Sequence, residues 1–263
     1  MSSNEGWSRP FDDLRGRRVL VTGSARGIGA AAALGFAQCG ARLALHYVRS
    51  QDAARQTFER LGGEAAGHVL LRADLGQAGE AARLVESAAS ALGGLDVLVN
   101  NAGNPFGRLR VAEIGAAERR GIVQLNLDAV VEAIQAAVPH LARSGNGVIV
   151  NVSSIAARSG GGAGVTVYAA AKGGVEALTR GLAKELAGQG IRVNCVEPGF
   201  VDTEIHQGFT GPAEREHYLA STPMKRAGTV DECVGAFLFL ASAKTGGYIT
   251  GQVLAVNGGA AMF

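Results

Sequence analysis

Cysteine is scarce in this sequence and never occurs in close pairs. The three cysteines, Cys39, Cys195 and Cys233, lie far apart and form no C-x-x-C motif, which argues against a zinc site and against a disulfide framework. The five histidines share no spacing with carboxylates or cysteines that would favour a metal site. We therefore expect no metal, and a reducing cytoplasm as the setting.

The sequence also lacks an excess of charge of one sign and long hydrophobic runs. The formal net charge is only +2, so nothing favours nucleic acid or an acidic membrane as a partner. No run approaches the ~20 consecutive apolar residues of a membrane span. The polar start of the chain also lacks the apolar core of a signal peptide. We expect a small-molecule partner, no nucleic acid and no membrane.

What the chain does have is enough apolar material for one large core. Hydrophobic types make up 47% of its 263 residues, which suits a single α/β domain. No proline- or serine-rich linker and no repeat divides the chain, and its 39 glycines are dispersed. We expect a flexible tail over residues 1–14 and one domain over residues 15–263.

Short β-rich runs alternate with longer helical patterns along the whole chain. Short apolar strands that are each followed by a helix indicate a parallel sheet buried on both faces. Right-handed crossovers then give a Rossmann-type, doubly wound sheet of about seven strands with helices on both faces. Strands are expected at 18–22, 43–47, 69–73, 96–99, 148–152, 192–196 and 252–256, and helices at 28–39, 51–61, 77–92, 116–143, 167–187 and 230–241.

A glycine-rich turn follows the first expected strand directly. It reads Gly23-Ser24-Ala25-Arg26-Gly27-Ile28-Gly29, with G-x-x-x-G-x-G spacing. Glycines allow the backbone to approach a pyrophosphate, and the N-terminus of the following helix offers free N–H groups and a positive dipole end. The turn therefore favours dinucleotide binding, and the alternative is a glycine-rich helix start packed tightly on the sheet.

Tyr168 and Lys172 form a second pattern, with Ser154 upstream. Residues four apart share one face of a helix, and a neighbouring ammonium favours the phenolate and lowers the pKa of the phenol. A phenol that exchanges its proton near neutrality is what reduction of a carbonyl requires. The alternative for the pair, taken alone, is solvated helix surface.

Together these segments resemble the short-chain dehydrogenase/reductase family. The resemblance rests on the turn, on Ser154, Tyr168 and Lys172, and on later segments in the family's order. It covers residues 17–259 and is greatest to the 3-oxoacyl-[acyl-carrier-protein] reductase-like branch. The later segments are Asn100-Asn101-Ala102-Gly103, Pro198-Gly199-Phe200-Val201-Asp202-Thr203, Tyr248-Ile249-Thr250-Gly251 and Asn257-Gly258-Gly259.

The resemblance implies a catalytic set of four residues. Tyr168 would exchange the proton, Lys172 would lower its pKa and hold the nicotinamide ribose, and Ser154 would hydrogen-bond the substrate oxygen. Asn126 would bend its helix and hold a water for proton relay, or else be a core amide satisfied by the backbone. Ser154 lies fourteen residues before Tyr168, where thirteen is common in the family, so Ser153 is a weaker candidate for the serine role.

The expected cofactor is NADP(H), with NAD(H) less favoured. An acidic residue near the end of the second strand binds the ribose 2′-hydroxyl in NAD enzymes of this fold, and none stands there. Arg26 and Arg49 would reach a 2′-phosphate, unless both are solvated surface arginines. Asp74 would contact adenine or cap the next helix. The family positions also place Gly23, Ser24, Gly27, Ile28, Gly29, Tyr47, Leu75, Asn100, Ala102, Gly103, Pro198, Gly199, Val201 and Thr203 around the cofactor.

The expected activity is interconversion of a carbonyl and a secondary alcohol by hydride transfer. A lid is expected over 199–223, including His206 and Phe209, with further walls at 104–106 and 155–165. The resemblance implies a homotetramer. Two other functions remain open: a non-catalytic dinucleotide-binding redox sensor or scaffold, and an epimerase or dehydratase of the same family. The natural substrate is not indicated.

Overall fold

A parallel seven-stranded sheet forms the centre of the molecule. The computed structural model describes residues 10–203 and 210–262. The sheet order is β3-β2-β1-β4-β5-β6-β7, and every neighbouring pair is parallel. This confirms the expected doubly wound α/β fold. The strands are β1 Arg18–Val21, β2 Arg42–Tyr47, β3 Val69–Arg72, β4 Val97–Asn100, β5 Gly147–Val152, β6 Ile191–Pro198 and β7 Val253–Val256.

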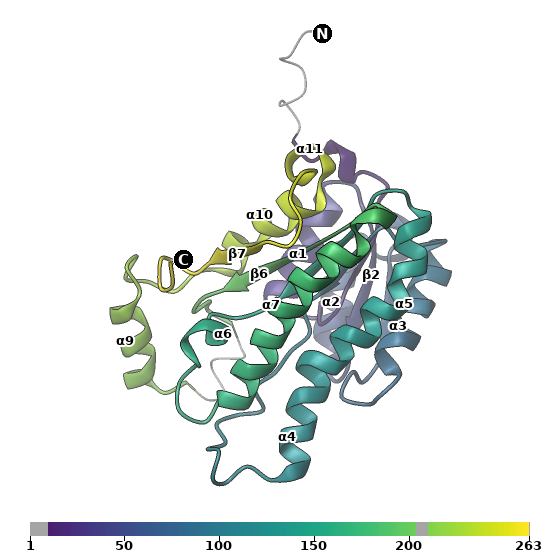
Figure 1. Cartoon of the computed structure of the whole chain (residues 1–263). Helices are drawn as coiled ribbons and strands as arrows, with labels where there is room; N and C mark the ends of the chain where they lie inside the picture. Colours follow the sequence, from purple (N-terminus) through teal and green to yellow (C-terminus); the bar gives the residue numbers. More distant parts are fainter. Residues whose placement is uncertain (1–9, 204–209, 263) are drawn as a thin grey trace.

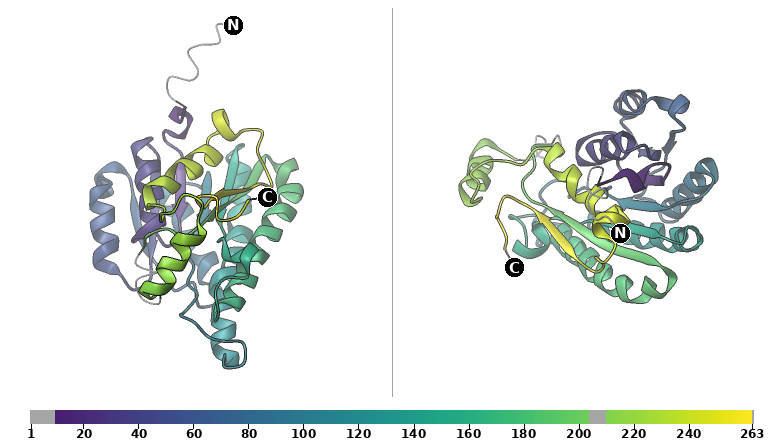
Figure 2. Two further views of the ribbon diagram at one scale, coloured as in Figure 1. Left: turned by 90° about the vertical axis from the view of Figure 1, so that its left-hand side faces the viewer. Right: turned by 90° about the horizontal axis from the view of Figure 1, so that it is seen from above.

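Helices cover both faces of the sheet (Figures 1 and 2). One apolar cluster joins the sheet to α3, α5 and α7, and a second joins its other face to α1, α2 and α10. The central strands are therefore buried on both sides, which explains their unbroken apolar sequences. The helices are α1 Gly27–Gln38, α2 Gln51–Arg60, α3 Glu80–Leu92, α4 Ala116–Val123, α5 Ala129–Arg143, α6 Ala156–Ser159, α7 Thr166–Leu186, α9 Pro212–Ser221, α10 Val230–Ala241 and α11 Ala243–Gly246.

The strand order reverses between β1 and β4. Val19 and Val21 of β1 lie opposite Val97 and Val99 of β4, while β2 and β5 continue the sheet in opposite directions. In open α/β sheets the crevice at such a reversal, beyond the carboxyl ends of the strands, is where ligands bind. The glycine turn and the segment after β4 both begin at this edge.

The segment before β1 is anchored to the far end of the chain. Residues Asp12–Leu14 form a short 3-10 helix, and Leu14 is buried. The carboxylate of Asp13 accepts a hydrogen bond from the Ser242 hydroxyl at 2.8 Å and from the Ala243 N–H at 2.7 Å. Within the expected tail, the Asp13 carboxylate thus caps the start of α11, and flexibility of the tail stays a prediction.

The long helix expected over 116–143 is interrupted. Between α4 and α5, residues Gln124–Asp128 form a π-helical segment, η3, and such single-turn bulges often mark functional sites. Taken as one, Ala116–Arg143 is long enough to cross a membrane and contains an 18-residue stretch that is apolar enough to do so. Here it packs against α3 and α7, and core helices of soluble proteins share this length and composition.

The expected lid over 199–223 contains a helix. α9 begins with Pro212 at its first turn, a position where proline is well tolerated. Residues 204–209, with the predicted lid residues His206 and Phe209, lie outside the described part of the chain.

Candidate active site

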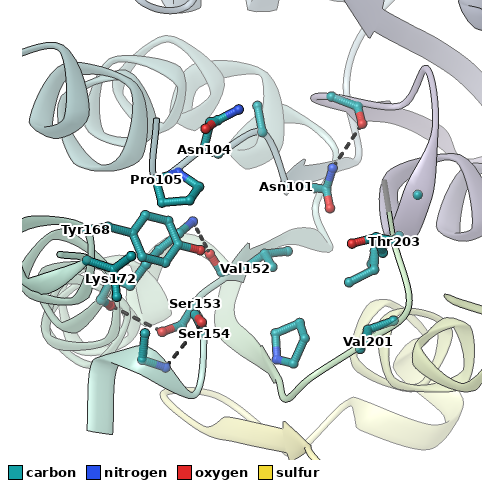
Figure 3. A pocket seen from close by; sticks show the side chains of 18 of the residues that line it. Asn101, Asn104, Pro105, Val152, Ser153, Ser154, Tyr168, Lys172, Val201 and Thr203 are labelled. Atoms are coloured by element: carbon teal, nitrogen blue, oxygen red, sulfur yellow. Dashed lines mark hydrogen bonds between the residues drawn. The ribbon is translucent and has the colours of Figure 1, made fainter. Parts of the chain in front are cut away.

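A large cavity lies at the carboxyl edge of the sheet. Its volume is about 810 Å³, within the range of about 300–1,000 Å³ that ligand pockets usually have. Its lining comes mainly from the ends of β2, β5 and β6, from the loops that follow β1 to β6, and from α7 and α9. Figure 3 shows Tyr168, Lys172 and Ser154 on one side, with Val201 and Thr203 across from them.

The glycine turn is clamped to the start of the β4 loop. The Asn101 side-chain amide donates to the carbonyls of Thr22 at 2.9 Å and Gly23 at 3.1 Å. In return, the Thr22 hydroxyl accepts from the N–H groups of Asn101 and Ala102, both at 3.0 Å. A Cβ at Gly29 would stand 2.4 Å from the Gly23 carbonyl oxygen. Only glycine therefore allows this tight turn, which fits the backbone cradle that a pyrophosphate needs.

Most of the predicted cofactor residues line the cavity. Arg26 and Arg49 are both exposed at this part of the site. The other predicted residues in the lining are Gly23, Gly27, Ile28, Gly29, Tyr47, Asp74, Leu75, Ala102, Gly103, Pro198, Gly199, Val201 and Thr203.

Two predicted cofactor residues do not face the cavity. Ser24 is fully buried beneath the turn, and its hydroxyl accepts from the His46 N–H at 2.8 Å. Asn100 is buried within β4 and donates from its amide to the Asn151 side chain at 2.9 Å. Alternation along the strand turns Asn100 inward and brings the next residue, Asn101, to the cavity. Ser24 and Asn100 therefore do not line the cavity, and their place around the cofactor stays a prediction.

Tyr168, Ser154 and Lys172 meet at one end of the cavity. Tyr168 and Lys172 lie on α7, and Ser154 follows β5. The phenol of Tyr168 is hydrogen-bonded to Ser154. The Lys172 Nζ donates to the Val152 carbonyl at 2.8 Å and lies 5.7 Å from the centre of the Tyr168 ring. The phenol of Tyr168, the hydroxyl of Ser154 and the ammonium of Lys172 thus lie together at one end of the cavity.

The acidity of Tyr168 differs from the expectation. Burial raises the pKa of Tyr168 to about 12, and the hydrogen bond with Ser154 opposes the rise. Burial also lowers the pKa of Lys172 to about 8. The prediction that the phenol is more acidic than usual is wrong for the polypeptide itself, because the loss of solvation outweighs the effect of Ser154. The phenol is protonated at neutral pH.

Ser153 and Ser154 point in different directions, because successive side chains alternate at the end of β5. The Ser153 hydroxyl is buried and lies 2.9 Å from a carboxylate oxygen of Glu176 and 3.2 Å from the Lys172 carbonyl. The Ser154 hydroxyl accepts from the Ala156 N–H at 3.2 Å and lies beside Tyr168. Of the two, Ser154 is the serine whose hydroxyl reaches the proton donor.

Asn126 lies in the π-helical segment and is fully buried. Its amide nitrogen donates to the carbonyls of Ile122 and Asn104, both at 2.8 Å, and its oxygen accepts from the Asn104 N–H at 3.0 Å. The backbone thus satisfies both amide hydrogens. A Cβ at Gly103 would stand 2.8 Å from the Asn126 oxygen and 3.0 Å from the Lys172 Nζ. Glycine at 103 therefore lets both groups approach the cavity.

The far wall of the cavity is assembled from three loops. The Arg108 guanidinium pairs with Glu214 of α9 and donates to the Ala163 carbonyl at 2.9 Å. The Tyr218 hydroxyl donates to Glu214 at 3.1 Å, and its ring stacks on Phe200 with 5.1 Å between ring centres. Sequence reasoning missed Arg108 and Glu214, which are too far apart in the chain for any spacing to connect them.

A family model described as enoyl-(acyl carrier protein) reductase matches residues 23–261. The 3-oxoacyl-[acyl-carrier-protein] reductase of Thermotoga maritima is 39% identical over 248 residues, covering 94% of this chain and 98% of that protein. The enzyme of the same name from Staphylococcus aureus is 35% identical over 243 residues, covering 92% and 97%.

Solved structures agree with these relatives. An NADH-dependent reductase responsible for alginate metabolism superposes with a TM-score of 0.87 at 37% identity, covering 96% of this chain and all of that one. A blue fluorescent protein from a metagenomic library, in complex with NADPH, superposes with a TM-score of 0.86 at 37% identity, covering 95% and 99%.

Proposed function

The chain belongs to the short-chain dehydrogenase/reductase family, and from this premise we propose that it is an NADP(H)-dependent oxidoreductase that interconverts a carbonyl and a secondary alcohol. The observation that carries the proposal is the hydrogen-bonded pair of Tyr168 and Ser154 in a cavity that also contains the glycine turn. We further propose a 3-oxoacyl thioester as substrate, a homotetrameric assembly and a cytoplasmic setting, in which all three cysteines are free thiols.

The residues of the cavity fit a nicotinamide dinucleotide. The turn after β1 offers backbone N–H groups at the start of α1, where a pyrophosphate is favoured. Arg26 and Arg49 supply positive charge at the end of β2, and that end carries no carboxylate to repel a 2′-phosphate. Guanidinium groups pair well with phosphate oxygens, which supports NADP(H) over NAD(H). Lys172 uses one of its three donors on Val152 and keeps two for ribose hydroxyls.

A nicotinamide dinucleotide held by the glycine turn, Arg26, Arg49 and Lys172 would supply a hydride to the carbonyl carbon. The Tyr168 hydroxyl gives its proton to the carbonyl oxygen, and the resulting phenolate recovers a proton from water. The Ser154 hydroxyl donates to the same oxygen and stabilises the negative charge that builds there. Because the pKa of Tyr168 is about 12, the phenol holds its proton at neutral pH, which is the form that can give a proton to the carbonyl oxygen.

The test is consumption of NADPH with a panel of 3-oxoacyl thioesters, simple ketones and secondary alcohols, followed at the nicotinamide absorbance band. We expect stoichiometric oxidation of NADPH with a 3-oxoacyl thioester, and NADPH affinity at least about tenfold above that for NADH in a fluorescence titration. Binding of NADPH without turnover of any carbonyl would favour a redox sensor or scaffold. Product formation without net NADPH consumption would favour an epimerase or dehydratase.

The homotetramer has a separate test. Light scattering at micromolar concentration measures the assembled mass directly. A mass of four chains is expected, and a monomer would reject this part of the proposal while leaving the chemistry untouched.

A further inference from the structure

A buried histidine lies directly beneath the glycine turn. The side chain of His46, near the end of β2, is only 3% exposed. Its Nδ1 lies 2.9 Å from the Gly23 N–H nitrogen, and its Nε2 lies 3.0 Å from the Ala73 carbonyl oxygen. Because an N–H only donates and a carbonyl only accepts, Nδ1 carries no hydrogen and Nε2 carries one. The contacts are thus those of the neutral imidazole.

The backbone of the same residue holds the next residue of the turn. The His46 N–H donates to the Ser24 hydroxyl at 2.8 Å, and the Ser24 N–H donates to the His46 carbonyl at 3.0 Å. His46 therefore contacts the turn through its side chain at Gly23 and through its backbone at Ser24. Gly23 and His46 both belong to the lining of the cavity, whereas Ser24 is fully buried and does not.

We propose that His46 is a positioning residue for the dinucleotide: its neutral imidazole fixes the glycine turn in the shape that receives the cofactor, and protonation of Nδ1 releases the turn. A protonated Nδ1 would place two N–H donors against each other at Gly23, so the turn would have to move. This inference rests on the proposed function, because it assumes that the cavity holds a nicotinamide dinucleotide.

The charges around the imidazole set the sign of its pH response. Burial lowers the pKa of His46 below 6.5, while its bond to Ala73 and the charge of Asp74, beyond the end of β3, oppose the shift. The segments next to His46 also carry Arg26 in the turn, Tyr47 on β2 and Arg72 on β3, and both arginines are exposed. Neutral imidazole is favoured at pH 7, and the turn should loosen only as the pH falls below 6.5.

The chain contains a matched control for this residue. His68, just before β3, is also buried, and its Nδ1 accepts from the Leu43 N–H at 3.1 Å. Its Nε2 lies 3.0 Å from the Leu61 carbonyl, and burial also lowers its pKa. His68 therefore has the same two kinds of backbone partner as His46, but these partners lie outside the lining of the dinucleotide cavity.

The experiment compares NADPH binding by the wild type, His46→Leu, His46→Asn and His68→Asn between pH 8 and pH 5.5. Asparagine places an acceptor oxygen close to the position of Nδ1 but does not take up a proton in this range. We expect His46→Leu to weaken NADPH binding about tenfold at pH 8, and His46→Asn to keep it within about threefold. The kcat at saturating NADPH should change little in either variant.

The pH response separates positioning from simple stability. From pH 8 to 5.5 the Kd of the wild type should rise more than that of His46→Asn, by up to about tenfold, and His68→Asn should follow the wild type. The 2′-phosphate of NADPH titrates near pH ~6 in every sample, so it cancels in the comparison. Thermal unfolding at each pH records any loss of fold, and the wild type and His46→Asn still give the answer if His46→Leu does not fold.

Three outcomes would overturn the inference. The first is an unchanged Kd in His46→Leu. The second is the same pH dependence in the wild type and His46→Asn. The third is tighter binding by the wild type at low pH, which would mean that attraction between a charged imidazole and the pyrophosphate dominates. A wild type that binds no dinucleotide at any pH would instead overturn the proposed function.

Discussion

The two halves of the cavity are built in different ways. In the dinucleotide half, buried backbone groups and short side chains hold the glycine turn, through Thr22, Asn101 and His46. In the substrate half, long side chains from separate segments contact one another. Arg108 pairs with Glu214 and donates a hydrogen bond to Tyr218. Phe106 in this half is 50% exposed.

This difference separates a preformed site from an adjustable one. Hydrogen bonds buried at the strand ends break only when the sheet itself unfolds, whereas contacts among partly exposed segments break at low free-energy cost. The dinucleotide half should therefore keep one shape with and without ligand, as long as His46 is neutral. The substrate half should adapt to its ligand, which suits a fold that accepts many carbonyl compounds.

The strongest test of the comparison is at the border between the halves. Tyr168→Phe removes the proton donor and little else, so kcat should fall by about a thousandfold while the Kd for NADPH stays within about twofold. Steady-state kinetics and a nucleotide titration on the same preparation measure both quantities. Near-normal turnover in this variant would reject the assigned mechanism.

The next largest effect is expected at the ribose end of the dinucleotide half. Arg49→Glu should reverse the local charge and lower the ratio of NADPH to NADH affinity by about a hundredfold. Arg55→Glu makes the same charge change on the exposed surface of α2, outside the cavity lining. It serves as the matched control. An equal fall of the NADPH-to-NADH affinity ratio in both variants would mean that the effect comes from the overall charge of the protein and not from Arg49 at the site.

Lys172 can be tested through the free energy of unfolding. The ammonium is 2% exposed, and the fall of its pKa from 10.5 to about 8 corresponds to a burial cost of about 3 kcal/mol. Lys172→Met relieves this cost but loses the bond to Val152, so we expect a net gain of about 1–2 kcal/mol at pH 7 together with loss of turnover.

The pH dependence of this gain has a definite sign. The folded wild type releases the Lys172 proton above about pH 8, while the unfolded chain keeps it until 10.5. The wild type should therefore become more stable across this range on account of Lys172, and the advantage of Lys172→Met should shrink toward pH 10.5. Urea unfolding of both proteins at pH 7 and 10 gives the comparison, and a gain that grows with pH would contradict it.

The smallest effect is expected in the substrate half. Arg108→Gln breaks the pair with Glu214 and should raise the KM for the carbonyl substrate by about three- to tenfold, with the Kd for NADPH unchanged. Arg83→Gln breaks an exposed pair with Glu80 on α3 and should change neither. A shift in NADPH affinity in Arg108→Gln would show that the two halves are coupled.

The difference between the two halves of the cavity also explains which features the sequence could predict. The strands and the glycine turn follow from local patterns, and each expected strand end is within a few residues of the observed one. Asn101 was missed in favour of Asn100 because the choice depends on which side of β4 faces the cavity. The pKa of Tyr168 was predicted in the wrong direction because burial cannot be read from a four-residue spacing. The pairing of Arg108 with Glu214 depends on loops that only the folded chain brings together.

One property of the sheet has a practical consequence. Within residues 10–203 and 210–262, the strand order takes the chain across the β1–β4 border once, between β3 and β4, through α3 and the exposed Gly93 and its neighbour Gly94. A cut between these glycines would sever no strand or helix and would leave the glycine turn on one polypeptide and Tyr168 on the other. Neither fragment alone would carry a complete site. If the two fragments were fused to two other proteins, proximity of those proteins would bring the fragments together. The reassembled site would then be detected as a loss of NADPH absorbance.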